Sequence, residues 1–311
     1  MNEEKQSFLT LFDEFKRKAE PLLEKLSQLR KSTIFPILFH LQASIAPWCV
    51  SKVYDAILQL NEKELENVDV IVFSLGGDAD AAYHIGRMLH KHVKGNLTFI
   101  VSRIAASAAT LLTFAGNKIL MLPSSQLGPI DPQIEVAPGR YVSARSLREA
   151  TELIITKIVN AKEIPKSTVE GFLEKLPLLE VVDYERLLNH TMELATNLLK
   201  LRMMKEDEKT ASRIAEIFVK KFGYHERCIT VDECREIGLK VEEPTEEELA
   251  TIWEFTKLWE EFALLRARLG SKIYSLRIGK GIAFIPAEKE ENSEPKETPI
   301  DVLIEKLTRL T

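Results

Sequence analysis

Three short stretches of the sequence hold residue types that could do chemistry together. Gly76 and Gly77 lie in SLGGDAD, where an apolar segment ends, and Ser107 lies among alanines in RIAASAATLL. Asp131 lies between two prolines in LGPIDPQ. A nucleophilic alcohol, a rigidly held carboxylate and backbone amides open to a ligand are the parts that acyl-transfer catalysis uses. Each stretch also has a plain structural explanation.

The two glycines could hold an anion. Without a Cβ, the backbone can approach a ligand closely, and the N–H groups at the start of a helix face outward. That geometry suits an oxyanion or a phosphate. The G-x-G-x-x-G spacing of a dinucleotide site is missing, and an ordinary tight turn explains the glycine pair equally well.

Ser107 and Asp131 each have two interpretations. The N–H of Ala108, in the first turn of the helix expected after Ser107, has no intrahelical partner and could stabilise an oxyanion. The commoner role of a serine at such a position is to cap the helix. Pro129 and Pro132 would hold the Asp131 carboxylate rigidly, although an ordinary turn aspartate also fits.

A serine nucleophile needs a general base, and the chain contains six histidines. Five of them fit structural or solvated roles: three on the helix after the glycines, one in an apolar strand, and one in mid-helix without a nearby carboxylate pattern (His84, His90, His92, His40 and His190). His225 falls in a turn between two helices, where a loop could carry it into a cleft. Local sequence alone does not select it.

The residues around these stretches predict an α/β fold. Near-continuous apolar strands alternate with helices, which is typical of a parallel sheet covered on both faces. The expected strands are 34–40, 68–75, 97–101 and 118–122, and the expected helices are 48–60, 79–93 and 107–115. From residue 143 onward the chain is expected to be almost entirely helical.

The chain divides into five expected segments. They are an amphipathic helix within 1–31 that Pro21 could kink, a catalytic region at 32–242, a long helix and hairpin at 243–287, a flexible linker at 288–298 and a C-terminal helix at 299–311. The linker is charged and lacks large apolar residues. A short helix on such a tether suggests docking to a partner or a neighbouring subunit.

Composition excludes several classes of protein. The 311 residues are 45% hydrophobic with a net charge of −5. The sequence shows no stripe of lysines and arginines interleaved with aromatic residues, which argues against a nucleic-acid-binding protein. Cys49, Cys228 and Cys234 lack the spacing of a metal site or a disulfide framework, which favours a reducing, cytoplasmic setting. Neither a signal-peptide core nor a membrane span is evident, so the chain is expected to be soluble.

Together the stretches resemble the Clp-protease/crotonase superfamily, and within it the serine dehydrogenase proteinase family, which is related to signal peptide peptidase. The resemblance runs from about Ile34 to about Val241. It is carried by LGGDADAAYHIGRML, RIAASAATLLTFAGNKILML, LGPIDPQI and YHERCITVDECREIGLKV, in that order. It implies a repeated ββα core with an extensive helical C-terminal part.

The resemblance also implies roles for residues. Ser107 would be the nucleophile, Asp131 the orienting acid and His225 the base of a serine endopeptidase. The N–H groups of the oxyanion hole would come from the glycine turn and the serine turn (Gly76, Gly77 and Ala108). It further implies a peptide or protein substrate, a homo-oligomer such as a trimer, hexamer or larger ring, and no metal or cofactor.

Three residues depart from the family pattern. The family usually has proline where Leu75 stands, glycine where Ala109 stands, and aspartate where Glu226 follows the histidine. None of these changes removes a proposed catalytic group. Leu75 and Ala109 are expected to reshape the oxyanion pocket.

Three alternatives stay open. A lysine such as Lys157 or Lys162 could replace His225 as base, as in signal peptide peptidases. A crotonase-like enzyme acting on acyl-coenzyme A would use the local carboxylates Asp78 and Asp80. The chain could also be a catalytically silent assembly module; without a G-x-x-x-x-G-K-[ST] motif, any ATPase partner would be a separate chain.

Overall fold

The computed structural model describes residues 3–137, 140–160, 171, 178–222, 224–265 and 273–286. Its strands are β1 (Thr33–Ile34), β2 (Ile37–Phe39), β3 (Val68–Ser74), β4 (Leu97–Ala105), β5 (Lys118–Met121), β6 (Gln126–Leu127), β7 (Gln133–Ala137), β8 (Arg140–Ser143), β9 (Val241–Glu242), β10 (Ile273–Ile278) and β11 (Gly281–Pro286). Its helices are α1 (Glu3–Arg30), α2 (Pro47–Ile57), α3 (Ala79–His92), α4 (Ala108–Thr113), α5 (Ala144–Asn160), α7 (Leu178–Leu201), α8 (Glu208–Glu216), η1 (Ile217–Lys221), α9 (Val231–Ile237) and α10 (Glu246–Leu265).

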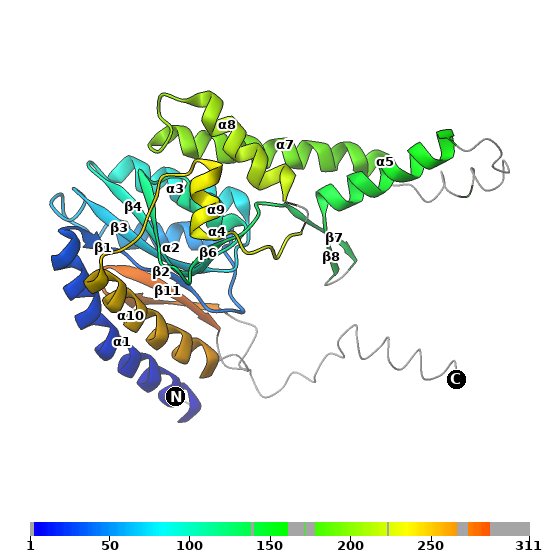
Figure 1. Cartoon of the computed structure of the whole chain (residues 1–311). Helices are drawn as coiled ribbons and strands as arrows, with labels where there is room; N and C mark the ends of the chain where they lie inside the picture. The colour runs from blue at the N-terminus through cyan, green and yellow to red at the C-terminus, as the bar shows by residue number, and fades with distance from the viewer. Residues whose placement is uncertain are drawn as a thin grey trace.

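One large sheet organises the described chain, in the strand order β10-β11-β2-β3-β4-β5-β9 (Figure 1). Its pairs are parallel except for the β10–β11 hairpin. Every residue of β3 is buried, because helices cover both faces of the sheet. The expected α/β fold with a parallel sheet is therefore confirmed.

Two apolar cores lie on the two faces of the sheet. One is lined by α2, α3, α4, α7 and α8. The other packs α1 and α10, which run side by side in Figure 1, and its aromatic rings are in mutual contact (Phe12, Phe15, Phe255, Trp259 and Phe262). The structure thus joins an N-terminal and a C-terminal helix over one face.

A buried charge cluster fixes the end of α1. The Arg30 guanidinium makes ion pairs with Asp69 of β3 and, at 2.8 Å, with Glu248 of α10. The Ser32 hydroxyl also donates to Asp69, at 2.8 Å. These carboxylates outweigh the effect of burial and raise the pKa of Arg30. The cluster ties together three elements that are distant in the sequence.

Several expected elements have different bounds. Pro21 lies inside one continuous α1, so no break in the helix occurs. The strand expected at 34–40 is two strands, with Pro36 between them. The strand expected at 97–101 continues to Ala105, beyond a register shift opposite β3, which carries the chain further toward Ser107.

From residue 144 onward the described chain is mostly helical, apart from the short strand β9 and the β10–β11 hairpin, which falls in the 243–287 segment where a hairpin was expected. A small hairpin, β7–β8, lies before α5, and the β10–β11 hairpin joins the main sheet through β11 and β2. The expected linker at 288–298 and helix at 299–311 lie outside the described residues. No helix in the described part of the chain is long and apolar enough to cross a bilayer.

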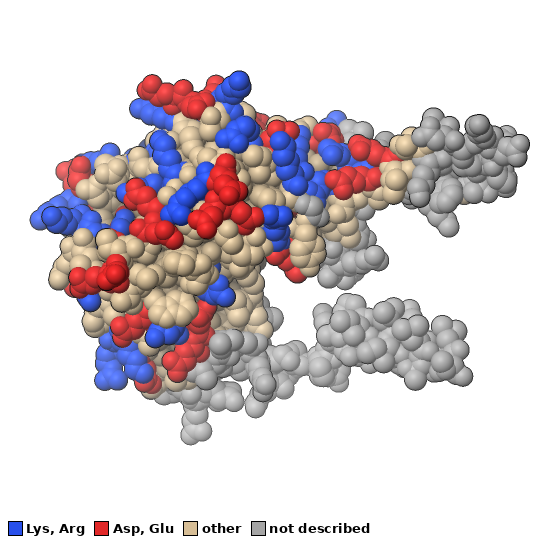
Figure 2. Space-filling view, viewed as in Figure 1, with Lys and Arg blue, Asp and Glu red and all other residues tan. Residues whose placement is uncertain are grey.

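Basic and acidic side chains lie side by side on the face seen in Figure 2. Several form ion pairs around α8 and α9, including Arg235 with Glu243 at 3.0 Å and Arg227 with Glu233 at 2.5 Å. Charges on this face are therefore largely compensated by their neighbours.

Candidate active site

The glycine turn is pressed against the serine turn. Gly76 and Gly77 have φ angles of +111° and +142°, which L side chains rarely adopt. A Cβ on Gly76 would lie 2.8 Å from the Ser107 Cβ, and one on Gly77 would lie 2.2 Å from the Ile45 carbonyl oxygen. Both positions therefore require glycine, and this contact brings residue 76 to residue 107.

Ser107 has a strained backbone. It connects β4 to α4 with φ 52° and ψ −120°, and it is one of two non-glycine residues with positive φ in the described chain, the other being Lys31. Its side chain makes no capping hydrogen bond, so the helix-capping interpretation is wrong. Such strain persists only where the surroundings impose it, and it is concentrated at functional sites.

Two of the three expected oxyanion amides are free. Within the described residues, the N–H groups of Gly77 and Ala108 donate to no acceptor, whereas the N–H of Gly76 donates to Ser74 Oγ at 3.1 Å. Asp78 caps α3 by accepting from the Ala81 N–H at 2.7 Å. Free amides at a helix start suit a developing negative charge.

The loop that carries Asp131 is fastened to the serine turn. The Thr110 hydroxyl of α4 lies 2.9 Å from the Gly128 carbonyl oxygen and accepts from the Gly128 N–H at 3.1 Å. A Cβ on Gly128 would lie 3.0 Å from that of Ala106. Sequence reasoning missed Thr110, although a threonine three residues after the serine, within a mostly apolar helix, was a usable signal.

Asp131 and His225 meet. His225 Nδ1 lies 3.8 Å from Asp131 Oδ2, with 2% of the Asp131 side chain and 33% of the His225 side chain exposed. Neither Asp131 oxygen nor His225 Nδ1 makes a well-formed hydrogen bond among the described residues; the Ser143 hydroxyl is close enough to Asp131 to lower its pKa but does not complete one. A buried carboxylate without a partner is costly, so this pair has a polar interaction still to complete.

The Asp131 carboxyl is electrostatically perturbed. Burial raises its pKa above the ordinary value. The Ser143 hydroxyl, the Arg145 guanidinium and the His225 ring act in the opposite direction and lower that pKa. Burial therefore disfavours the charged carboxylate. Ser143, Arg145 and His225 are the main groups that offset this effect.

The His225 loop is fixed at both ends. Arg145, 4% exposed, donates to the carbonyl oxygens of Phe222 and Lys220 at the end of the π-helix η1. Beyond the histidine, Ile229 and Leu127 exchange two backbone hydrogen bonds of 3.0 Å. Short π-helices are frequent at functional sites, and this one delivers the loop to the Asp131 turn. Arg145 was not identified from the sequence.

The two halves of the site converge at one edge of the sheet. Ala105, at the end of β4, pairs with Leu127 of β6, which in turn bonds Ile229. Ser107 follows β4, Asp131 follows β6, and His225 comes shortly before Ile229. No hydrogen bond joins Ser107 to His225 in the described chain; in unliganded enzymes such bonds often form only with substrate.

Two of the remaining histidines, His40 and His190, have defined partners. His40 is buried, with Nε2 2.6 Å from the Ala263 carbonyl oxygen and Nδ1 accepting from the Gln42 N–H, so its predicted core role is confirmed. The view that His190 has no carboxylate nearby is wrong. Its Nε2 lies 2.9 Å from Asp80, because α7 packs across α3.

The structure describes the two candidate lysines only in part. Lys157 belongs to α5, and its side chain lies outside the described residues, as does the whole of Lys162. Within the described chain, no group of three or more metal-ligating side chains is gathered.

The three catalytic candidates and the glycine turn all fall within residues 16–261, the range that matches the family described as ClpP-like SDH-type serine proteinase. The chain belongs to this family. The expected resemblance to the serine dehydrogenase proteinase family is thereby confirmed, and with it the general class of a serine peptidase. The match extends into α10, past the Val241 boundary expected from the sequence.

Family relatives include two archaeal proteins. Uncharacterized protein MJ0137 of Methanocaldococcus jannaschii is 28% identical over 246 residues, covering 76% of this chain and 77% of the relative. Uncharacterized protein MJ1495 of the same organism is 29% identical over 174 residues, covering 56% of this chain and 51% of the relative.

Solved structures with a similar arrangement include two mutant forms of the 1510-N membrane-bound stomatin-specific protease. One is 17% identical with a TM-score of 0.44, covering 70% of this chain and 82% of the other. The second, in complex with a substrate peptide, is 16% identical with a TM-score of 0.44, covering 89% and 96% of the two chains.

Proposed function

We propose that Ser107, Asp131 and His225 form the catalytic triad of a peptidase that hydrolyses internal peptide bonds. The observation that carries the proposal is the unpartnered, buried Asp131 carboxylate facing His225 Nδ1 at 3.8 Å. A hydrogen bond between them needs a heavy-atom separation of about 2.6–3.2 Å, so a small movement of the loop completes it.

The proposed mechanism follows from these positions. Ser107 Oγ attacks the peptide carbonyl carbon while His225 Nε2 takes its proton, and Asp131 holds the imidazole and stabilises its cationic form. The N–H groups of Gly77 and Ala108 stabilise the oxyanion. His225 then gives the proton to the leaving amine, and a water molecule hydrolyses the acyl-enzyme by the reverse sequence.

The acyl-coenzyme A alternative is less well supported. It relies on Asp78 and Asp80 as the local carboxylates. Asp78 is committed to capping α3, and Asp80 to an ion pair with His190. Neither is free to work as an acid or base on a substrate beside the glycine turn.

Covalent labelling tests the nucleophile. A fluorophosphonate probe should label the parent chain and fail to label Ser107→Ala, and Ser107→Ala should lose peptide hydrolysis by at least about 10³-fold. Ser124→Ala is the matched control, because Ser124 is exposed and follows a neighbouring strand. Equal labelling of Ser107→Ala and the parent would overturn the proposal, and labelling of neither would favour the silent assembly module.

The identity of the base needs a separate comparison. His225→Ala should lower hydrolysis by about 10²–10⁴-fold, while Lys157→Ala and Lys162→Ala should leave it within a few-fold. The opposite pattern would assign a serine–lysine dyad.

The oligomeric state stays a prediction, whether a trimer, a hexamer or a larger ring, and so does a partner for residues 299–311. Sedimentation of the full chain and of a chain ending at residue 287 checks both predictions.

A further inference from the structure

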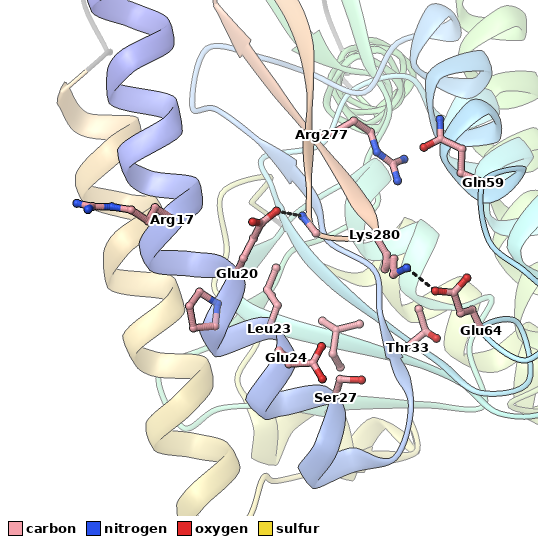
Figure 3. Close-up of a pocket in the computed structure, with 13 residues that line it drawn as sticks. Arg17, Glu20, Leu23, Glu24, Ser27, Thr33, Gln59, Glu64, Arg277 and Lys280 are labelled. Atoms are coloured by element: carbon pink, nitrogen blue, oxygen red, sulfur yellow. Dashed lines mark hydrogen bonds and ion pairs between the residues drawn. The ribbon is translucent and has the colours of Figure 1, made fainter.

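A cavity lies away from the candidate active site. Its volume is about 1110 Å³, and it lies between α1 and the β10–β11 turn (Figure 3). Ile282 of β11 donates to the carbonyl oxygen of Pro36, just before β2 begins, so the cavity lies at the amino end of the parallel strands. Gly76 and Ser107 follow the carboxyl ends of β3 and β4, at the opposite edge.

Arg277 of β10 lines this cavity and forms no ion pair with a carboxylate of the described residues. Its Nη1 atom is shielded from solvent and has no hydrogen-bond partner in the same part of the chain. Burial lowers the pKa of Arg277, with no opposing effect from a carboxylate that the structure describes. In Figure 3 its guanidinium points into the space facing Gln59, with no interaction drawn to it.

Two other arginines show how this chain normally treats a sheltered guanidinium. Arg30 has two carboxylate partners, Asp69 and Glu248, which raise its pKa despite burial. Arg202 instead donates to backbone carbonyls and side chains, including the carbonyl oxygens of Gly95 and Val93, both at 2.5 Å. Against this pattern, Arg277 is a cation whose interactions are incomplete.

Of the other charged residues that line the cavity, Arg17 has its guanidinium pointing away from it in Figure 3, and the remaining four have partners. Lys280 is ion-paired with Glu64, and Glu20 accepts from the Gly279 N–H at 3.3 Å (Figure 3). Glu24 accepts from Gln28 at 3.2 Å. Among the described residues, a ligand thus meets the Arg277 guanidinium inside a rim of three carboxylates (Glu20, Glu24 and Glu64). That rim repels an anion of high charge but tolerates a single negative group placed on the guanidinium.

We propose that this cavity binds a carboxylate group through Arg277, the carboxylate belonging to a small organic acid or to the C-terminus of a peptide. The planar guanidinium matches a carboxylate in a two-point hydrogen-bonded pair, and such charge-assisted pairs are the strong ones. Gln59 faces the same space and supplies a neutral amide beside the ion pair (Figure 3). This site does not depend on the proposed triad.

Thermal unfolding of the full-length chain tests the proposal. The Ser107→Ala background prevents cleavage of the probes. At fixed ionic strength the probes are sodium acetate, N-acetyl-trialanine with a free carboxyl, the same peptide as its amide, and sodium phosphate. Arg277→Gln removes the cation, and Arg277→Lys keeps the charge but lacks the planar group that makes two hydrogen bonds to one carboxylate. Arg17→Gln is the matched control, because the Arg17 side chain points away from the cavity in Figure 3.

The free-carboxyl probes should raise the Tm saturably, and Arg277→Gln should weaken their apparent affinity by about tenfold or more, with Arg277→Lys intermediate. Arg17→Gln should bind like the parent. A response to acetate and the peptide acid alike assigns a small organic acid; a response to the peptide acid alone assigns a peptide C-terminus. Shifts unaffected by Arg277→Gln, equal shifts with the amide, or a response to phosphate alone would each overturn the proposal.

Discussion

His225 Nδ1 faces Asp131 Oδ2 across 3.8 Å, although Asp131 lies in the loop between strands β6 and β7 and His225 in the loop between helices η1 and α9. The aspartate is buried between two prolines, and the histidine follows a π-helix whose end is held by Arg145. The relationship is therefore built by the packing of the loops, and it gives several testable consequences for activity and stability.

Replacing Asp131 with asparagine should trade activity for stability. Burial raises the pKa of Asp131 in the folded chain, so its protonated form is favoured there. The stability associated with that proton is fully present below the ordinary carboxyl pKa and is lost as pH rises through the raised value. An asparagine side chain stays neutral at every pH. The Tm of Asp131→Asn minus that of the parent should therefore grow as pH rises above the ordinary carboxyl pKa of about 4.

Hydrolysis by Asp131→Asn should fall by about 10²–10⁴-fold at neutral pH, because the imidazole loses the group that orients it. Thermal unfolding scans across pH, together with peptide hydrolysis, check both parts. A Tm difference that stays constant with pH would show that the carboxyl is not perturbed by burial.

Arg145 should affect the site in two ways: it holds the start of the His225 loop, and its positive charge acts on the Asp131 carboxyl. Arg145→Ala removes the bonds to the Phe222 and Lys220 carbonyls and the cation that lowers the pKa of Asp131. We expect kcat to fall about tenfold or more, and the acid limb of the activity profile to move to higher pH. Arg145→Lys should restore the acid limb in part.

Arg148→Ala is the control for Arg145. Arg148 lies on the same helix and pairs with Glu185 and Glu152, but it is not among the groups that shift the pKa of Asp131. Its pH profile should match that of the parent. A profile for Arg145→Ala that loses amplitude without moving would restrict Arg145 to a purely structural role.

Gly77 should tolerate no side chain. A Cβ there would lie 2.2 Å from the Ile45 carbonyl oxygen at φ +142°, so Gly77→Ala must displace the turn. We expect a loss of about 2–5 kcal/mol in the free energy of unfolding and loss of fluorophosphonate labelling. Gly171→Ala is the matched change, since nothing lies within 4 Å of its Cβ position, and it should stay within about 1 kcal/mol of the parent. Denaturant titration of both variants measures the difference.

The Arg30 cluster should dominate the attachment of α1. Arg30→Ala leaves Asp69, whose side chain is 5% exposed, without its cation and should cost roughly 2–4 kcal/mol in the free energy of unfolding. Lys18→Ala removes only an exposed pair with Glu14 and should leave the urea midpoint close to that of the parent. Similar midpoints for the two variants in a urea titration would contradict this account.

Local pattern was enough to predict much of the fold. The near-continuous apolar strands and their alternation with helices predicted a covered parallel sheet; in β3 only Asp69 and Ser74 are polar. Equally local signals bound α9, with a capping box between Thr230 and Glu233 at its start and Gly238 in the left-handed conformation at its end. These features depend on residues a few positions apart. The proline at position 21 misled, because packing against α10 outweighs the cost of one proline in a long helix.

The amino-acid sequence by itself determined which groups are available: a serine where a strand becomes a helix, glycines where backbone must pass closely, and an aspartate held by prolines. Only the tertiary structure decided which groups meet. It paired His225 with Asp131 and His190 with Asp80, and it left Arg277 Nη1 without a hydrogen-bond partner in the described part of the chain. The physical reason is that helix and strand propensities act over a few residues, whereas a charge's partners and solvent exposure depend on how distant segments pack.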